Sequence, residues 1–115
     1  MFVLRWTEEA SAEYARLKAK AEAALDVRRR KARAKSSRDE GLFKQVHKCV
    51  SLLAENPRHP GLHTHEYLSL VHPFDPQAKV FEAYVQNRTP GAYRVFWCYG
   101  PEPIQITVIA ITPHP

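Results

Sequence analysis

Residues 79–115 read KVFEAYVQNRTPGAYRVFWCYGPEPIQITVIAITPHP, and this C-terminal third of the chain decides its fold. The stretch contains three runs rich in β-branched and aromatic residues, Val80–Val85, Ala92–Tyr99 and Ile104–Thr112. Two short segments that contain proline and glycine, 86–91 and 100–103, separate the runs. Such spacing is typical of consecutive strands joined by tight turns. The sequence therefore predicts a three-stranded antiparallel meander.

One basic residue, Arg94, interrupts the apolar middle run of this meander. Burial of a guanidinium without partners is costly, so Arg94 is expected either to meet a carboxylate or to face an open groove. In the first case it forms a structural salt bridge with Glu82 on the neighbouring strand. In the second case it binds a phosphate, for which a planar and permanently charged group is well suited.

The residues before the meander predict a strand, a helical hairpin and a loop. Thr7 precedes two glutamates and suits the N-cap of a first helix, and Ser37 stands three residues before Glu40, as in a capping box that opens a second helix. Asn56-Pro57 ends this second helix. We expect an α+β chain with a strand over 2–6, a helical hairpin over 8–55, a loop over 56–78 and the meander over 79–115. An additional short strand is possible at Leu68–Val71, so the helices would pack on a C-terminal antiparallel sheet of three to four strands.

Composition limits the classes of protein to which the chain can belong. With 115 residues, 44% of them hydrophobic, it is expected to form a single globular domain. No apolar run has the length of a membrane helix, and the first residues do not resemble a secretory signal. Cys49 and Cys98 occupy apolar positions and are expected to be buried free thiols. The net charge of +5 permits a polyanionic partner.

Basic residues at three places are candidates for contact with RNA. The segment 28–38 between the two predicted helices contains seven basic residues and no acidic one. The same charges also suit a solvated helix end, where cations complement the helix dipole. The candidate RNA-binding residues are Arg28, Arg29, Arg30, Lys31 and Arg33 in this segment, Arg58 and Lys79 beside the loop, and Arg88 in the first turn of the meander.

The histidines of the chain suggest proton transfer more than metal binding. His114 lies just beyond the last predicted strand, between two prolines, and histidine is the side chain that most often transfers protons at neutral pH. It is equally compatible with an exposed tail. His63, His65 and His72 lack an acidic or cysteine partner at the spacing of a metal site, so neither a metal nor another cofactor is expected.

The order of elements and four segments resemble the RelE/ParE toxin superfamily of bacterial type II toxin–antitoxin systems. The segments are FVLRWTEEA at 2–10, ENPRHPGLHTHE at 55–66, GAYRVFWCYG at 91–100 and ITVIAITPHP at 106–115. Resemblance to the RelE/YoeB-like branch implies a cytoplasmic, ribosome-dependent endoribonuclease that inhibits translation and is neutralised by an acidic antitoxin. By this resemblance Arg94 binds the scissile phosphate, His114 matches the terminal histidine, and Glu66 is the carboxylate base.

Two departures from that branch keep other functions open. The segment 28–38 is longer than in compact relatives, and Lys79 is the only lysine after Lys48, whereas the RelE branch has a lysine-rich sheet face. The ParE-like branch, which poisons DNA gyrase without nuclease chemistry, is therefore an alternative. A non-toxic RelE-fold module that only binds a partner is a further one.

Overall fold

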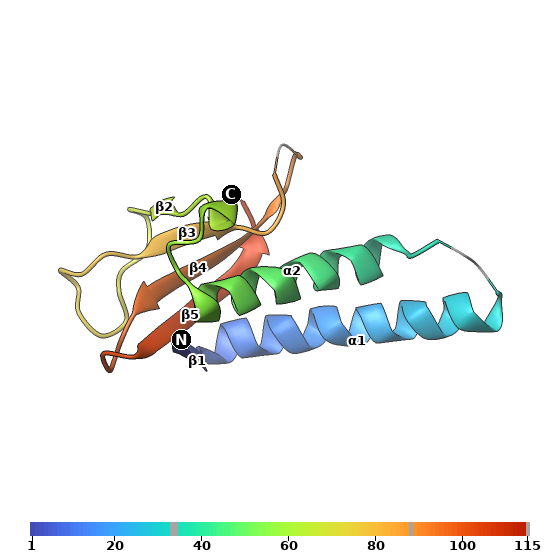
Figure 1. Cartoon of the computed structure of the whole chain (residues 1–115), viewed down its shortest axis with the longest axis horizontal. Helices are drawn as coiled ribbons and strands as arrows, with labels where there is room; N and C mark the ends of the chain where they lie inside the picture. The colour runs from blue at the N-terminus through green and yellow to red at the C-terminus, as the bar shows by residue number, and fades with distance from the viewer. Residues whose placement is uncertain (33–34, 88, 115) are drawn as a thin grey trace.

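A computed structural model describes residues 1–32, 35–87 and 89–114 of the chain (Figure 1). It has an α+β fold, as predicted, in which two helices cover one face of a five-stranded sheet. The elements are β1 (Val3–Trp6), α1 (Glu8–Arg30), α2 (Arg38–Glu55), the 3-10 turn η1 (Pro60–Leu62), β2 (His65–Glu66), β3 (Phe81–Tyr84), β4 (Tyr93–Tyr99) and β5 (Gln105–Pro113). Neither helix in the described part of the chain is long and apolar enough to cross a membrane.

The sheet has the strand order β1-β5-β4-β3-β2. The predicted meander is confirmed, since β3, β4 and β5 pair in antiparallel fashion, and β1 joins β5 in parallel. The fifth strand is β2, which pairs with β3 at the opposite edge. The additional strand expected at Leu68–Val71 is wrong because His65 and Glu66 already occupy the pairing edge of β3, while Leu68 and Val71 are exposed in the following turn.

Side chains of the sheet alternate between two different environments. Val95 and Trp97 of β4 point into the core, where they pack with Val46, Leu53 and other apolar residues of the helices. Arg94 and Phe96 alternate with them and therefore lie on the other face. The pairing of β4 with β5 shifts between Phe96 and Trp97, which is typical of a β-bulge.

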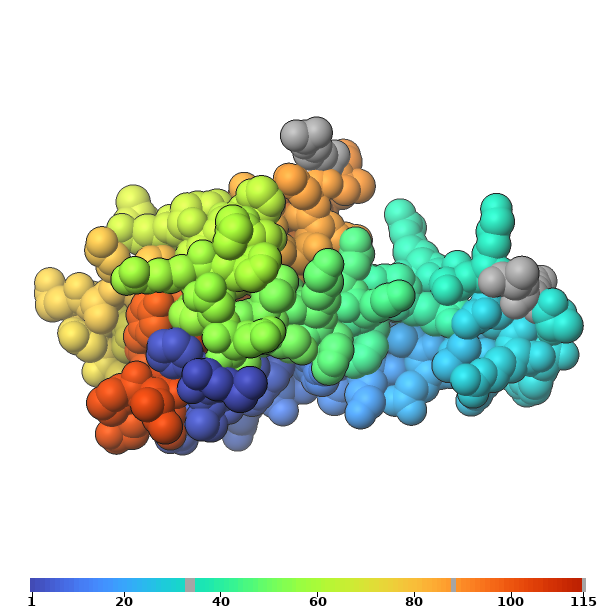
Figure 2. Space-filling model, in the orientation of Figure 1, coloured from blue at the N-terminus to red at the C-terminus, as the bar shows by residue number. Residues whose placement is uncertain are grey.

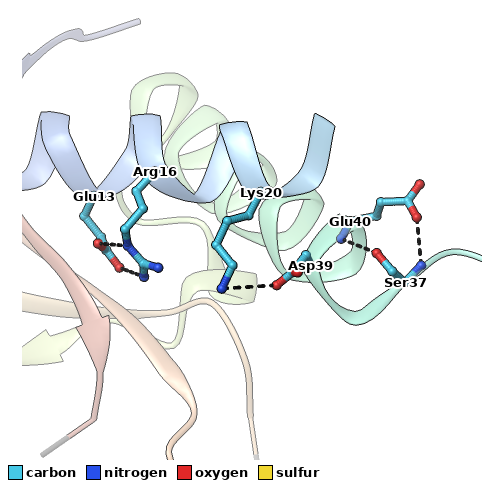
Figure 3. Close-up of polar contacts among 6 residues, drawn as sticks. All are labelled: Glu13, Arg16, Lys20, Ser37, Asp39 and Glu40. Atoms are coloured by element: carbon cyan, nitrogen blue, oxygen red, sulfur yellow. Dashed lines mark hydrogen bonds and ion pairs between the residues drawn. The ribbon is translucent and has the colours of Figure 1, made fainter. Parts of the chain in front are cut away.

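The helical hairpin projects well beyond the sheet (Figures 1 and 2). The molecule measures 52 × 26 × 23 Å, and the buried residues of α1, Ala10, Leu17 and Ala21, extend no farther along the helix than Ala21. Polar contacts join the helices farther out, with Lys20 Nζ 3.7 Å from Asp39 Oδ1 and Arg28 Nη2 3.0 Å from Glu40 Oε1. The predicted capping box is present, because Glu40 N–H donates to Ser37 Oγ and Ser37 N–H donates to the Glu40 carboxylate (Figure 3).

The segment between β2 and β3 covers part of the sheet face opposite the helices. The ring of Tyr67 lies 4.7 Å from that of Phe96, centroid to centroid. His72 is buried, and its Nδ1 accepts hydrogen bonds from the backbone N–H groups of Phe74 and Asp75. Nε2 must then carry the proton and donate to the Tyr99 carbonyl at 2.9 Å. His72 therefore acts as a neutral structural anchor for this segment.

Candidate active site

A buried carboxylate, that of Glu82 in β3, forms the centre of the candidate site. Only 1% of its side chain is exposed, and it contacts two histidines from distant parts of the chain. His65 Nε2 of β2 lies 2.6 Å from Oε1, and His114 Nε2, beyond β5, lies 3.3 Å from Oε2. The second contact has the length of an ion pair but not hydrogen-bond geometry, so Oε2 accepts no hydrogen bond from the described residues.

The burial of Glu82 follows from its position in the sheet. It lies on the central part of β3, in register with Phe96 of β4 on one side and His65 of β2 on the other. Side chains directly opposite each other share a face, so β2 places the imidazole of His65 beside the carboxylate. The backbone N–H of His114 donates to the Ala92 carbonyl at 2.8 Å, which fixes the chain end against β4.

Arg94 lies on the same face as Glu82 but does not pair with it. Its Nη1 donates to the carbonyls of Gln86, at 2.6 Å, and Tyr93, at 3.1 Å, and its guanidinium carbon lies 3.8 Å above the ring centre of Tyr84. The side chain is 8% exposed, and Nε is buried without a hydrogen-bond partner among the described residues. Of the two alternatives for Arg94, the salt bridge with Glu82 is therefore wrong, because backbone carbonyls and an aromatic ring hold the guanidinium instead.

Aromatic contacts connect Arg94 to the histidines. Tyr84 lies in register with Arg94, and its ring is 5.7 Å from that of His65 and 5.4 Å from that of His63. Arg94, Tyr84, His65, Glu82 and His114 thus form one cluster on the sheet face opposite the helices, which we call the Glu82 cluster. It brings together a permanent cation, a carboxylate and two groups that can exchange protons at neutral pH.

Glu66, the carboxylate matched by the family resemblance, does not lie in this cluster. It is in register with Phe81, whose ring stacks on Trp97 of the core, so Glu66 is directed to the other face of the sheet. The charge nearest to it is Lys79 Nζ, 4.0 Å from Oε1. A one-residue step along β2 thus separates Glu66 from the face that carries Arg94.

The candidate RNA-binding residues lie in separate regions. Arg28, Arg29, Arg30 and Lys31 are at the far end of the helical hairpin from the sheet (Figure 1), and Arg28 is paired with Glu40. Arg58 is exposed beside η1, and Lys79 precedes β3. Arg33 and Arg88 lie outside the described residues. Those of the candidate cations that the structure describes therefore do not form one surface with Arg94.

Sequence reasoning did not select Glu82 or His65 as functional residues. Glu82 was considered only as a partner for Arg94, and His65 only as one of three histidines that lack the partners of a metal site. The feature that distinguishes Glu82 is a carboxylate at the centre of an apolar β-run, FEAY, where it is in register with apolar Phe96. A buried carboxylate requires partners, and the imidazoles that supply them come from segments 17 and 32 residues away in the chain.

The two cysteines are buried free thiols, as predicted. Cys49 belongs to the core beneath the sheet, and Cys98 is on β4. Burial raises the pKa of Cys49 to about 12 and that of Cys98 to about 11. Neither thiol has the lowered pKa of a nucleophilic cysteine.

Comparison with known proteins identifies the fold. No family model and no curated protein matches the sequence. Among solved structures, the chain is similar to the YoeB dimer from Staphylococcus aureus, with a TM-score of 0.60 and 9% identity over 99% of this chain and 98% of that one. It is also similar to the YoeB/ParE toxin from Agrobacterium tumefaciens, with a TM-score of 0.55 and 11% identity over 97% and 98%. The resemblance read from the sequence is therefore confirmed at the level of the fold, which the chain shares with these two toxin structures.

Proposed function

We propose that this protein is the toxin of a toxin–antitoxin pair and that it cleaves mRNA on the ribosome by acid–base chemistry. The observation that carries the proposal is the Glu82 cluster, in which one buried carboxylate contacts two histidines on the sheet face of Arg94. Two imidazoles and a guanidinium can supply the base, the acid and the charge stabilisation for cleavage of a phosphodiester by the neighbouring 2′-hydroxyl.

Each group has a defined task in the proposed reaction. Nε2 of His65 contacts Glu82 and Nδ1 lies 3.2 Å from the His63 carbonyl, so His65 acts as base through Nδ1 once the substrate displaces that carbonyl. Transfer of the 2′-hydroxyl proton to this Nδ1 allows the 2′-oxygen to form a bond to phosphorus, and proton donation by His114 lets the bond from phosphorus to the 5′-oxygen break. The products are a 2′,3′-cyclic phosphate and a 5′-hydroxyl. The register of β2 favours His65 over Glu66 as the base, because His65 shares the face of Arg94.

Arg94 and Glu82 support these proton transfers without exchanging protons themselves. The guanidinium of Arg94 neutralises charge that develops on the phosphorane, a contribution worth roughly 3–4 kcal/mol for one donor in comparable sites. Because Nη1 is occupied by backbone carbonyls and Nε is buried, Nη2 is the donor left for a phosphate. Glu82 contacts Nε2 of both imidazoles and orients the two rings.

The proposed partners follow from charge and from the fold. The chain has 17 basic and 12 acidic residues. This net positive charge favours an acidic antitoxin, whose amphipathic segment would fold onto the toxin. The toxins with similar structures support a toxin role. Both the ribosome and the mRNA are polyanions, and a toxin acting on them works in the cytoplasm.

A cell-free translation assay with labelled mRNA, with and without ribosomes, tests the proposal. We expect cuts only with translating ribosomes, a loss of about 10²–10³-fold in Arg94→Lys, and losses of at least about 10²-fold in His65→Ala and His114→Ala. Glu66→Gln is the matched control and should cleave normally. Thermal unfolding checks that each variant is folded.

Several outcomes would contradict the proposal. Intact mRNA with wild-type protein would remove the nuclease function, and a DNA gyrase supercoiling assay would then test the ParE-like alternative. That alternative is favoured by the burial of Arg94 under Tyr84 and its use of Nη1 within the protein, which suit a structural role. Full cleavage by folded Arg94→Lys would contradict the role of the guanidinium.

A further inference from the structure

A hollow lies on the sheet face that the helices cover, opposite the face of the Glu82 cluster. It has a volume of about 460 Å³ and lies between the segment 57–64, which follows α2, and three aromatic residues of the sheet, Phe81, Trp97 and Tyr99. In Figure 1 the yellow-green segment after α2 passes beside β3. Phe81 and Trp97 alternate along their strands with Glu82 and Phe96, so this aromatic pocket faces away from Arg94.

Two polar atoms of the pocket residues are buried without partners. Trp97 is 1% exposed, and its indole Nε1–H makes no hydrogen bond within the described part of the chain. The hydroxyl of Thr64 is also buried and unpaired there. Buried donors are almost always satisfied in native proteins, so these two groups call for acceptors that the described residues do not supply. Because both atoms are closed to solvent in this structure, a ligand in the cavity supplies those acceptors only if the segment 57–64 shifts when the ligand binds.

The remaining walls define the shape and charge of this ligand. The ring of Phe81 stacks on that of Trp97 with centroids 4.8 Å apart, and Tyr99, 40% exposed, stands edge-on to Trp97 at 5.0 Å. Such walls suit a flat aromatic ring. Arg58, which is exposed, and two histidines, His59 and His63, add basic groups to the lining, and no carboxylate lines the pocket.

We propose that the aromatic pocket binds a nucleotide, with its base packed against the aromatic side chains and its phosphate against Arg58. The base supplies acceptors for Trp97 Nε1–H and the Thr64 hydroxyl, which a hydrocarbon ring could not. The volume lies within the range of about 300–1,000 Å³ for small-molecule sites. The assignment of this nucleotide to RNA rests on the proposed function and makes the pocket a second contact for the strand cleaved at the Glu82 cluster.

The same aromatic walls would accept the aromatic side chain of a partner protein. The nucleotide is favoured because Arg58, His59 and His63 stand beside the cavity without an acidic residue in its lining. A phosphate pairs with the guanidinium of Arg58 and accepts hydrogen bonds from imidazole N–H groups, whereas an aromatic side chain leaves the guanidinium without a counterpart.

The test is an NMR titration of ¹⁵N-labelled protein that follows the two indole N–H signals. The chain has two tryptophans, and Trp6→Phe assigns the remaining signal to Trp97. The probes are the 5′-monophosphates of adenosine, guanosine, cytidine and uridine, with ribose 5-phosphate and N-acetyltyrosinamide as comparisons. We expect at least one nucleotide to shift the Trp97 signal in a saturable way while that of Trp6 stays in place.

Matched variants locate the contacts. Thr64→Val should weaken binding about threefold to tenfold, the effect of one hydrogen bond, and Thr64→Ser should keep most of the affinity. Arg58→Ala should weaken nucleotide binding about tenfold. Arg5→Ala removes an exposed arginine of β1 outside the pocket and should bind as wild type.

Three results would overturn the proposal. These are no Trp97 shift with any nucleotide, an equal shift with ribose 5-phosphate, or a shift with N-acetyltyrosinamide alone. Because mononucleotide binding requires no cleavage, this outcome is separate from that of the translation assay. Nucleotide binding by a protein that leaves mRNA intact would sustain the pocket and remove only the proposed nuclease activity.

Discussion

Removal of both histidines from the Glu82 cluster should leave a buried carboxylate without a partner, and the loss of stability can be estimated. Breaking a fully buried ion pair costs about 3–5 kcal/mol. His65 and His114 are 48% and 45% exposed, so water enters when either is removed. We expect about 1–3 kcal/mol for His65→Ala, which removes the 2.6 Å contact, and about 3–5 kcal/mol for His65→Ala with His114→Ala.

The informative experiment adds Glu82→Gln to both backgrounds. In the wild-type background, the glutamine side chain cannot make the charge-assisted contact with His65 that Glu82 makes. Glu82→Gln should therefore be neutral there or destabilise the protein by up to about 2 kcal/mol. In the background without histidines it removes an unpaired charge from the interior and should stabilise by about 1–3 kcal/mol. The effect of Glu82→Gln on the free energy of unfolding should thus have opposite signs with and without the two histidines.

Urea unfolding at neutral pH, followed by tryptophan fluorescence and far-UV circular dichroism, gives the four free energies of unfolding. Equal slopes against urea would show that the variants unfold from comparable states. An additive cycle, with Glu82→Gln having the same effect in both backgrounds within about 0.5 kcal/mol, would refute the coupling inferred from the structure. So would a variant without both histidines that is as stable as wild type.

Two further predictions concern titratable groups outside the cluster. The hydrogen bond from Arg28 holds the pKa of Glu40 below its usual range, so its contribution to stability is present above the unfolded-state pKa and is lost as pH falls through the folded value. Arg28→Ala should reduce the loss of stability on acidification measured by urea unfolding, and Arg29→Ala should not. Because burial raises the pKa of both Cys49 and Cys98, a thiol-exchange reagent at mildly alkaline pH should label native protein far more slowly than protein in urea; fast native labelling would contradict their burial.

The elements that the sequence predicts well are those governed by local chemistry. Strand runs broken by proline and glycine produced β3, β4 and β5 within about two residues of their observed bounds. Thr7 and Ser37 mark helix starts because their side chains accept hydrogen bonds from backbone N–H groups three residues ahead. Asn56-Pro57 ends α2 for an equally local reason.

The features that escape sequence reasoning depend on register. β2 has two residues, too few to show a periodic pattern, yet its pairing decides that His65 and not Glu66 stands beside Glu82. A shift of one residue would exchange their faces. The parallel pairing of β1 with β5 joins segments about 100 residues apart. The local sequence of neither strand indicates that it pairs with the other.

The polar groups that the structure leaves unsatisfied are concentrated at the two proposed sites. Among the described residues, four buried side-chain atoms lack hydrogen bonds, and they belong to Thr64, Glu82, Arg94 and Trp97. Glu82 and Arg94 share the sheet face of the proposed chemistry, while Thr64 and Trp97 line the aromatic pocket. Each orphaned group lowers stability by about 1–3 kcal/mol, so a chain under selection for folding alone would replace or pair it. Their retention at two places on one sheet is the expected pattern where a ligand completes the hydrogen bonds, and it links the chemistry at Glu82 to recognition at Trp97.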